Sequence, residues 1–414
     1  MVMPGYKQTE IGVLPDSWDT ITFEECFTIL PNNTLSRAEL NYNGGEVQNI
    51  HYGDILVKFP AVLDCSTEGL PYINKENVSK ASKGFLRDGD LIMADTAEDV
   101  IVGKSTEVIG IGDSKIVSGL HTIPCRPMDA EMFAPKWLGY FINHCTYHDQ
   151  LIPYITGIKV SSVSKSAISS TVIAVPPKPE QEAIAEALTD IDTLIVNLEK
   201  LIAKKKAIKQ GAMQELLTGK LRLPGFKKEW TNKKLSELCD IEMGQSPDSR
   251  YYSSSEGVPL VQGNADIEDR QTIIRFFTKN ITKKATKGDI IFTVRAPVGN
   301  VAHAMFDCCI GRGVCALQSG SDFLYHLLVF KQDMWSTVSS GSTFDSINSD
   351  TLCNTMLFVP VDEKEQIAIA RILTDMDEEI TILEKRLVKT KNIKAGMMSE
   401  LLTGRIRLID KEDV

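Results

Sequence analysis

The feature that most limits how this chain can fold is an internal repeat. From Glu180 and Glu365 onward, two segments align without a gap at a constant offset of 185 positions. Of the 44 aligned pairs between residues 180–223 and 365–408, 26 are identical, which is far beyond chance. The chain is therefore a tandem of two similar halves, each made of a less similar head followed by a repeated segment.

The repeated segment has the pattern of a long amphipathic helix. Apolar residues recur at alternating spacings of four and three, which places them on one stripe of a helix. The predicted coiled-coil seam consists of Ile184, Leu188, Ile191, Ile195, Leu198 and Ile202 in the first copy and Ile369, Leu373, Met376, Ile380, Leu383 and Leu387 in the second. Gly219 and Gly404 supply a glycine stop at the ends. About 40 residues at 1.5 Å each predict a rod of roughly 60 Å.

The charges along each predicted helix are polarised. The first copy begins with acidic residues, from Glu180 to Asp192, and ends with basic ones, from Lys200 to Lys209. The second copy is basic from Lys385 to Lys394. Antiparallel pairing sets acid against base, whereas parallel pairing would set base against base. We predict an antiparallel coiled coil of the two repeats; the alternative is that each helix packs on its own head or on another chain.

The two heads have the mixed pattern of α/β (α+β) domains. Short apolar runs with Gly-Asp turns, as in YGDILVKF, DGDLIMADT and KGDIIFTVRAPVGNVA, predict strands of a twisted, mostly antiparallel sheet. The runs PKWLGYFINHCTYHDQLI and SDFLYHLLVFKQDMWSTVSS predict helices. The expected fold is two such heads separated by two long antiparallel helices, with a pseudo-two-fold internal repeat. The expected boundaries are 1–176 and 223–360 for the heads, and 177–222 and 361–414 for the helices.

Composition narrows the class of protein. The formal net charge is −10, which argues against a protein that coats nucleic acid through bulk electrostatics. No stretch approaches the roughly 18 apolar residues of a membrane span, and the N-terminus lacks the pattern of a secretory signal. Nine scattered cysteines without a CxxC pair make disulfides and structural zinc improbable. We expect a soluble, cytoplasmic protein without a membrane partner.

Motifs of catalytic chemistry are incomplete in this sequence. Gly103-Lys104-Ser105 has the tail of a phosphate-binding loop, but Glu98 stands where the first glycine belongs. His144 and His148 have the i, i+4 spacing of a metal pair but no catalytic glutamate between them. Cys308, Cys309 and Cys315 have no identifiable base and are read as buried small apolar residues. We expect no catalytic residue, no metal site and no cofactor in this chain.

The residues of the repeat resemble a known family. The pattern from Val359-Pro360 to Asp377, slightly shortened from Val175-Pro176 to Asp192, is followed by ELLTGxxRL in both copies. It is similar to the repeated framework of type I restriction-modification specificity subunits. MGQSPDSRYY, TKGDIIFTVRAPVGNVA, CIGRGVCAL and SGSTFDSI in the second head look like a target recognition domain of that family. The first head matches more loosely, through GVLPDSW, YGDI, DGDLIMA and TGIKVSSVS.

This resemblance implies a non-catalytic subunit that recognises double-stranded DNA. Each head is expected to read one half of an asymmetric, bipartite target, and the helices are expected to set the unread spacer. The implied partners are two methylation subunits that carry S-adenosylmethionine, joined by restriction subunits that use ATP and Mg.

Loop segments rich in hydrogen-bond donors supply the expected DNA contacts. In the second head these are Gln245, Ser246, Arg250, Tyr251, Asn264, Arg295, Arg312, Ser342 and Thr343. In the first head they are Lys58, Lys104, Lys159, Ser161, Ser162 and Lys165.

Three other readings are open from the residues alone. One is a fused restriction-methylation enzyme, which methyl transfer by the purified chain would reveal. Another is a coiled-coil scaffold that binds only proteins. The third is a relative of the same family that works with a single, fused methylation subunit.

Overall fold

The computed structural model describes residues 3–81, 84–157, 160–318, 320–339 and 346–409. They form two compact units. One unit comprises residues up to 197 together with those from 387 onward, and the other comprises residues 198–386. Each unit therefore contains one head together with part of both long helices.

The two repeats form long helices of equal length. Helix α6 spans Lys178–Leu216 and helix α10 spans Glu363–Leu401, 39 residues each. Gly219 and Gly404 follow the helix ends with φ of +71° and +65°, the left-handed conformation that glycine adopts without a steric penalty. The predicted glycine stops are therefore confirmed.

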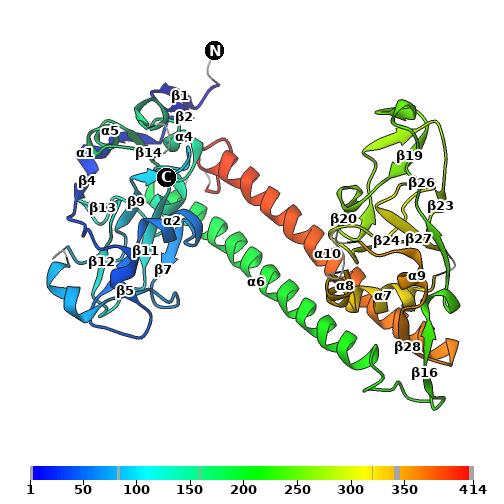
Figure 1. The fold of residues 1–414 in the computed structure, drawn as a ribbon. Coiled ribbons are helices and arrows are strands. Elements are labelled where there is room, and N and C mark those ends of the chain that lie inside the picture. The colour runs from blue at the N-terminus through cyan, green and yellow to red at the C-terminus, as the bar shows by residue number, and fades with distance from the viewer. Residues whose placement is uncertain (1–2, 82–83, 158–159, 319, 340–345, 410–414) are drawn as a thin grey trace. The chain divides into compact units, whose positions relative to one another are not determined.

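Ion pairs between the helices establish their direction within each unit. Figure 1 shows α6 and α10 as the two long helices of the chain. In the first unit, Lys394 Nζ near the end of α10 lies 2.6 Å from Asp192 Oδ1 in the early part of α6. In the second unit, Lys205 Nζ near the end of α6 lies 2.6 Å from Glu379 Oε1 in the early part of α10. The late part of each helix thus faces the early part of the other, so the predicted antiparallel pairing is confirmed within each unit.

The predicted seam residues form the least exposed stripe of the two helices. Ile184, Leu188, Ile369 and Leu373 are fully buried, Leu198, Ile202 and Ile380 are buried, and Ile191, Ile195, Met376, Leu383 and Leu387 are half-buried. Other apolar positions on the same helices, such as Val196 and Ile382, are exposed. The spacing of four and three therefore identified the inward face.

The beginning of each helix also packs on its own head. Ile184 and Leu188 belong to a buried cluster with Trp18 and Trp137 of the first head and Leu402 at the end of α10. Ile369 and Leu373 belong to the corresponding cluster of the second head, which includes Met213, Leu216 and Leu217 of the α6 end. Pairing between helices and packing on the head, which the sequence presented as alternatives, therefore occur together.

Two buried carboxylates fix the helices at these junctions. Glu180 and Glu365 are fully buried and occupy equivalent positions of the repeat. Glu365 accepts two hydrogen bonds from Arg222, at 2.6 and 2.8 Å. Glu180 pairs in the same way with Arg407 and also accepts a 2.8 Å hydrogen bond from Trp18 Nε1. Each arginine follows the end of the other helix, so the two Arg–Glu pairs close both units alike.

The described residues of the first head form two sheets and three two-stranded ribbons. One sheet has the order β4 (Phe27–Ile29), β13 (Thr122–Pro127), β9 (Leu91–Ala94), β11 (Ser105–Ile109) and β7 (Val62–Asp64). The other has the order β12 (Ile116–Ser118), β6 (Gln48–Ile50), β8 (Tyr72–Ile73) and β5 (Leu40–Asn41). The ribbons pair β1 (Tyr6–Thr9) with β2 (Gly12–Pro15), β3 (Asp19–Thr22) with β15 (Val172–Val175), and β10 (Thr96–Ala97) with β14 (Ser161–Ser162).

The second head repeats this plan. One sheet has the order β17 (Asp240–Met243), β27 (Val314–Gln318), β24 (Ile290–Thr293), β25 (Val301–His303), β21 (Gln271–Thr272) and β20 (Ile267–Glu268). The other has the order β18 (Tyr252–Ser253), β22 (Phe276–Thr278), β19 (Val258–Val261), β26 (Cys308–Ile310) and β23 (Lys284–Ala285). A ribbon pairs β16 (Trp230–Lys234) with β28 (Met356–Pro360). Most pairs are antiparallel as predicted, but the strands of each head divide into two main sheets instead of one.

Helices of the heads are shorter than the sequence predicted. The first head has α1 (Phe23–Cys26), α2 (Tyr52–Val57), α3 (Trp137–Ile142), α4 (Cys145–His148) and α5 (Lys165–Ser169), and the second has α7 (Asp322–Phe330), α8 (Gln332–Ser339) and α9 (Ser349–Cys353). The prediction of a strand in YGDILVKF was wrong, because this run forms α2. The His51 ring accepts a hydrogen bond from the Gly53 amide and starts the helix.

The region around His144 and His148 is not one helix. The imidazole of His144 accepts a hydrogen bond from the backbone amide of Thr146, so His144 caps the start of α4 instead of continuing α3. His148 Nε2 lies 2.8 Å from the carbonyl oxygen of Val102. Both rings therefore serve local structure. Cys308, Cys309 and Cys315 are fully buried, as predicted, and all nine cysteines are free.

Candidate nucleic-acid interface

Loops at the strand ends of the second head gather four of the nine residues that the sequence singled out in this head. The backbone N–H of Gln245 donates to the Ile310 carbonyl at 2.9 Å, and the backbone N–H of Val294 donates to the Gly313 carbonyl at 2.9 Å. These bonds join the loop after β17, the loop after β24 and the loop between β26 and β27. Gln245, Ser246, Arg295 and Arg312 lie on these three connected loops, although they are far apart in sequence.

Close backbone contact explains the glycines of this loop cluster. A Cβ built on Gly244 would meet the Gly311 carbonyl oxygen at 2.1 Å, and one on Gly313 would meet the Gln262 carbonyl oxygen at 2.1 Å. Any side chain at these positions would push the loops apart. The glycines in MGQS and IGRG therefore keep the loop cluster compact, while the residues between them extend outward.

The polar side chains of this cluster are positioned by contacts within the head. Ser246 Oγ accepts a 3.1 Å hydrogen bond from the backbone amide of Arg312. The guanidinium group of Arg312 takes no part in this bond, and the Arg312 side chain is exposed. Arg295 is exposed, and its backbone forms an isolated antiparallel bridge with Ser346. Gln245 is also exposed. These four residues present amide, hydroxyl and guanidinium groups from one compact set of loops.

Other predicted residues of the second head lie on neighbouring segments. Arg250 stacks on Tyr251, with the guanidinium carbon 4.9 Å from the ring centroid, and its Nε lies 3.4 Å from Asp248. Asn264 is half-buried and accepts a 2.6 Å hydrogen bond from Asn300 Nδ2. Ser342 and Thr343 lie outside the described residues.

Three polar residues of the second head were missed by the sequence. The side chain of Gln262 accepts a 2.8 Å hydrogen bond from Tyr252, and its backbone lies against Gly313. Arg270 donates to Asn300 Oδ1 at 3.1 Å, which continues the hydrogen bonds from Asn300 to Asn264. Asn300 lies within the run TKGDIIFTVRAPVGNVA, but no local motif marks Gln262 or Arg270, which the pairing of distant strands brings to the loop cluster.

The first head has the same backbone frame. In the first head, the backbone N–H of Asn33 donates to the Ser118 carbonyl. In the second head, the backbone N–H of Gln245 donates to the Ile310 carbonyl. The Asp95 amide of the first head donates to the His121 carbonyl, as Val294 does to Gly313. The Gly119 amide donates to Ile50, and the Gly311 amide donates to Val261. These matching hydrogen bonds define equivalent positions in the two heads despite their low sequence similarity.

Equivalent positions in this frame carry different side chains. Asn33 stands where the second head has Gln245, and Thr96, which follows the same strand, stands where it has Arg295. Leu120 replaces Arg312, and His121 replaces Gly313. The two heads therefore present different chemical groups from one common arrangement of loops.

Two of the four basic residues predicted as contacts in the first head are engaged in local interactions. Lys58 Nζ lies 2.5 Å from Glu68 Oε1, and this hydrogen bond raises the pKa of Lys58. Lys104 Nζ donates to the Leu56 carbonyl at 2.9 Å, and burial lowers its pKa. Lys165 is exposed at the start of α5. Lys159 lies outside the described residues.

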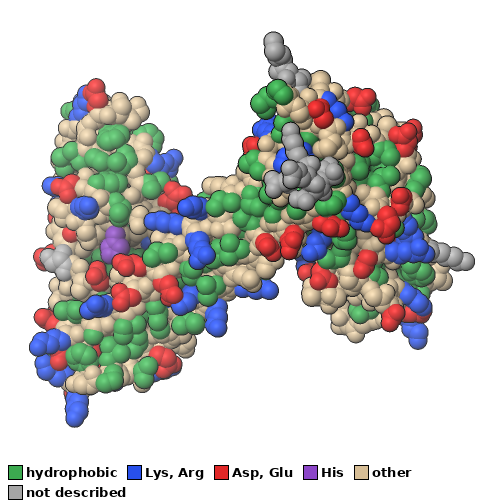
Figure 2. All heavy atoms as spheres, turned by 180° about the vertical axis from the view of Figure 1, so that it is seen from behind, with side chains coloured by type: hydrophobic (Ala, Val, Ile, Leu, Met, Phe, Trp, Pro, Cys, Tyr) green, Lys and Arg blue, Asp and Glu red, His purple; other side chains and the backbone are tan. Residues whose placement is uncertain are grey.

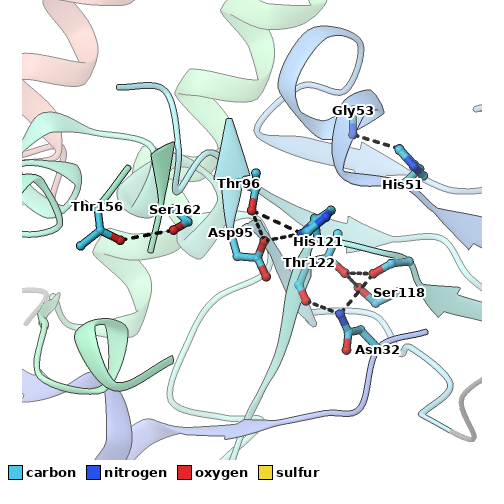
Figure 3. Close-up of polar contacts among 11 residues, drawn as sticks. Asn32, His51, Gly53, Asp95, Thr96, Ser118, His121, Thr122, Thr156 and Ser162 are labelled. Atoms are coloured by element: carbon cyan, nitrogen blue, oxygen red, sulfur yellow. Dashed lines mark hydrogen bonds and ion pairs between the residues drawn. The ribbon is translucent and has the colours of Figure 1, made fainter. Parts of the chain in front are cut away.

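A polar cluster that the sequence did not indicate lies beside Ser161 and Ser162 in the first head (Figure 3). Strand β14 places Ser162 opposite Thr96 of β10, and Ser162 Oγ lies 3.3 Å from Thr156 Oγ1. The Thr96 hydroxyl donates to Asp95 Oδ1 at 2.8 Å, and both residues contact the ring of His121. The first head thus presents short polar side chains and one imidazole where the second head presents the arginines Arg295 and Arg312.

Charges of both signs are mixed on the molecular surface. On the face in Figure 2, Lys and Arg side chains are interspersed with Asp and Glu, with apolar side chains between them. Among the described residues, no group of three or more His, Cys, Asp or Glu side chains is arranged to hold a metal ion. No helix in the described part of the chain has the length and apolar composition that crossing a bilayer requires.

Comparison with known proteins agrees with this architecture. The family model for the type I restriction modification DNA specificity domain matches residues 15–210 and again residues 227–392. A putative type I restriction enzyme MjaX specificity subunit from Methanocaldococcus jannaschii is 28% identical over 425 residues, covering 97% of each chain. The MjaVIII specificity subunit of the same organism is 28% identical over 287 residues, covering 61% of this chain and 66% of its own length.

Solved structures show the same fold. The type I restriction-modification system S subunit from M. genitalium matches with a TM-score of 0.61 and 14% identity, over 93% of this chain and 96% of its own. A chain from a study of complex assembly and conformational transition of the type I R-M system matches with a TM-score of 0.56 and 22% identity, over 95% of this chain and 99% of its own.

Two repeated recognition heads joined to two repeated helices define a DNA specificity protein of restriction-modification systems. The chain belongs to the type I restriction-modification DNA specificity family. It is a specificity subunit with two recognition domains, the non-catalytic DNA-recognition subunit of such a system. Subunits of this family assemble with methylation and restriction subunits.

Proposed function

We propose that the two heads read two different half-sites of one asymmetric, bipartite DNA target. The observation that carries this proposal is the common backbone frame with different side chains at equivalent positions, Arg295 against Thr96 and Arg312 against Leu120. Sequence is read mainly by hydrogen bonds to base edges in the grooves. Two surfaces with the same backbone and different donors are suited to reading two different short sequences.

The side chains suggest how the half-sites differ in chemistry. In the second head, the exposed guanidinium groups of Arg295 and Arg312 can donate in pairs to the O6 and N7 acceptors of guanine. The amide of Gln245 can pair with the N6 and N7 atoms of adenine. The first head offers hydroxyl and imidazole groups instead, because the side-chain amide of Asn33 is buried and hydrogen-bonded within the head. Arg250, stacked on Tyr251, is suited to a phosphate contact that fixes the register.

The paired helices are proposed to set the unread spacer and to dock two methylation subunits. The equivalent ion pairs at Glu180 and Glu365 support this, because they give both units the same helix-to-head junction. A repeated surface can bind two copies of one partner. The methylation subunits are expected to supply S-adenosylmethionine, and the restriction subunits ATP and Mg.

Methylation mapping tests the proposed function. The chain is co-expressed with the methylation subunits of its own system in a host without other methylation, and the modified sites of the genome are sequenced. The expected result is one motif with two specific halves and an unread spacer. A host that expresses the methylation subunits without this chain is the control. A continuous motif, or the same motif without this chain, would refute the proposal.

A further inference from the structure

His121 has a backbone conformation that few residues other than glycine adopt. Its φ is +54°, in the left-handed region. The equivalent position of the second head is Gly313, which contributes no side chain. A strained conformation at a non-glycine residue persists when the surrounding structure holds it, and such residues concentrate at functional sites. The first head therefore keeps an imidazole where a glycine would satisfy the backbone more easily.

Two neighbours hold one nitrogen of this imidazole. His121 Nδ1 lies 3.4 Å from Asp95 Oδ1 and 3.4 Å from Thr96 Oγ1. The Thr96 hydroxyl donates its hydrogen to Asp95 Oδ1 at 2.8 Å, so its oxygen acts as an acceptor toward the ring (Figure 3). Since the Thr96 oxygen accepts and the nearby Asp95 carboxylate is an acceptor only, these two contacts favour the tautomer with the proton on Nδ1.

The opposite nitrogen is left for an external partner. The side chain of His121 is 46% exposed, and no hydrogen bond joins its Nε2 to another of the described residues. The ring of Tyr52 meets the imidazole edge to face, with centroids 5.3 Å apart, which limits rotation of the ring. In the neutral ring with the proton on Nδ1, Nε2 carries a lone pair and is a hydrogen-bond acceptor.

The chemistry of an acceptor selects one kind of DNA contact. Phosphate groups offer only acceptor oxygens, so they cannot pair with the Nε2 lone pair. The major-groove edges offer donors at the exocyclic amino groups, N6 of adenine and N4 of cytosine. A hydrogen-bond acceptor held in a fixed orientation is therefore suited to a base edge and not to the sugar-phosphate backbone of the DNA.

We propose that His121 Nε2 accepts a hydrogen bond from the exocyclic amino group of one base in the half-site of the first head, with Asp95 and Thr96 as positioning residues. This inference rests on the proposed function, because it names one reader within one head. His121 is thereby a residue that determines specificity at a single position of the target.

Two variants separate this role from a role in folding. His121→Gly places a glycine at this position, as the second head does, and removes the steric strain that the positive φ imposes on a residue with a Cβ atom. His121→Asn tolerates the same backbone conformation and can still donate to Asp95, but it is too short to reach the position of Nε2. Met128→Ala is the control, because Met128 is 60% exposed and follows the far end of β13, about 20 Å from His121 at ~3.3 Å per residue.

The first experiment maps the methylated motif for the chain and these three variants, each in complex with the methylation subunits. Both His121 variants are expected to keep thermal unfolding midpoints at or above that of the unaltered chain. Both are expected to relax one position in one half of the motif by about fivefold or more, since a mismatched base costs at least that much. Met128→Ala is expected to leave the motif unchanged.

The second experiment removes the amino group from the DNA. Duplexes carry purine in place of adenine, or 2-pyrimidinone in place of cytosine, at the relaxed position. The unaltered complex is expected to lose affinity by about fivefold or more, and the His121→Gly complex is expected to bind both duplexes equally. Equal loss of affinity in both complexes, or an unchanged motif in the His121 variants, would overturn the inference while leaving the bipartite target intact. Absence of a bipartite motif for the unaltered chain would refute the proposed function, and the inference with it.

Discussion

Arg222 and Glu365 form a two-point ion pair, with Nε–Oε1 and NH2–Oε2 distances of 2.6 and 2.8 Å. The carboxylate is fully buried, whereas the Arg222 side chain is half-buried. The equivalent pair in the other unit joins Arg407 to Glu180. Each pair connects the segment after one helix to the first turn of the other. The duplication has therefore preserved a tertiary contact as well as a sequence pattern.

Loss of the Arg407 side chain is expected to destabilise the first unit. Arg407→Met leaves the buried carboxylate of Glu180 without its cation, which costs about 3 kcal/mol of unfolding free energy. Denaturant unfolding followed by tryptophan fluorescence measures the change, because Trp18 donates to the same carboxylate. Arg405→Met is the control, since Arg405 is exposed and pairs only loosely with Glu400. Equal effects of the two substitutions would contradict a role for the buried pair.

Exchange of charges between the helices tests their antiparallel pairing. Lys394→Asp places two carboxylates at the position where Lys394 now lies 2.6 Å from Asp192. Adding Asp192→Lys restores an ion pair in the reverse sense. We expect the double variant to recover stability, with a coupling energy of about 0.5 to 1 kcal/mol in a double-mutant cycle. A coupling energy of zero would mean that the two side chains do not interact.

Acid is expected to weaken the second unit through His326. Burial lowers the pKa of His326 to about 4, and the charge of Lys209 adds to this effect. The unfolded chain therefore binds a proton near pH 6.5, while the folded state resists it. The stability contributed by the neutral ring is present above pH 6.5 and is lost as the pH falls toward 4, by on the order of 1 to 3 kcal/mol.

His326→Gln isolates this contribution. The amide can retain the hydrogen bond to Thr374, now 2.9 Å from the ring, but it does not titrate. Unfolding free energy is measured for both proteins from pH 7.5 to pH 4. Burial also lowers the pKa of His51, His144 and His303, so both proteins lose stability in acid. The unaltered chain is expected to have the steeper slope, and parallel slopes would contradict the assignment to His326.

Substitution of the exposed arginines of the second head is expected to affect DNA recognition alone. Arg295→Ala or Arg312→Ala removes donors suited to guanine, at a cost of about 1 to 3 kcal/mol in specific binding, which is roughly 5- to 150-fold. Assembly with the methylation subunits is expected to be unchanged. Binding of target and unrelated duplexes is compared at one salt concentration. Unchanged affinity for the target would remove these arginines from the interface.

The helices were the part of the fold that the sequence predicted best. The apolar stripe of each helix is long and regular. The seam residues between Ile184 and Ile202 and between Ile369 and Leu387 could therefore be assigned to the inward face from their spacing alone. The buried pairs at Glu180 and Glu365 were missed, although a signal existed. Arg222 and Arg407 recur at the same offset as the glutamates, and two repeated opposite charges at the helix ends could have been matched.

The heads were harder to predict because their sites depend on distant contacts. Asp95 and His121 meet only because β9 and β13 are neighbouring strands, and no local motif marks either residue. Lys58 and Lys104 were predicted as DNA contacts because of their charge. In the structure, Lys58 forms an ion pair with Glu68, and Lys104 donates a hydrogen bond to the Leu56 carbonyl. In the second head, the glycines of MGQS and IGRG indicated from the sequence the loops on which Gln245 and Arg312 lie, and contact of these residues with DNA stays a prediction.

A chimera tests most directly the claim that the heads are separate readers on a common frame. Residues 1–176 are replaced by a second copy of residues 223–360, and the methylated motif is mapped with the same methylation subunits. We predict a target whose two halves carry the same half-site, the one now read by the second head. A chimera that folds and assembles but still modifies the original asymmetric motif would contradict the account.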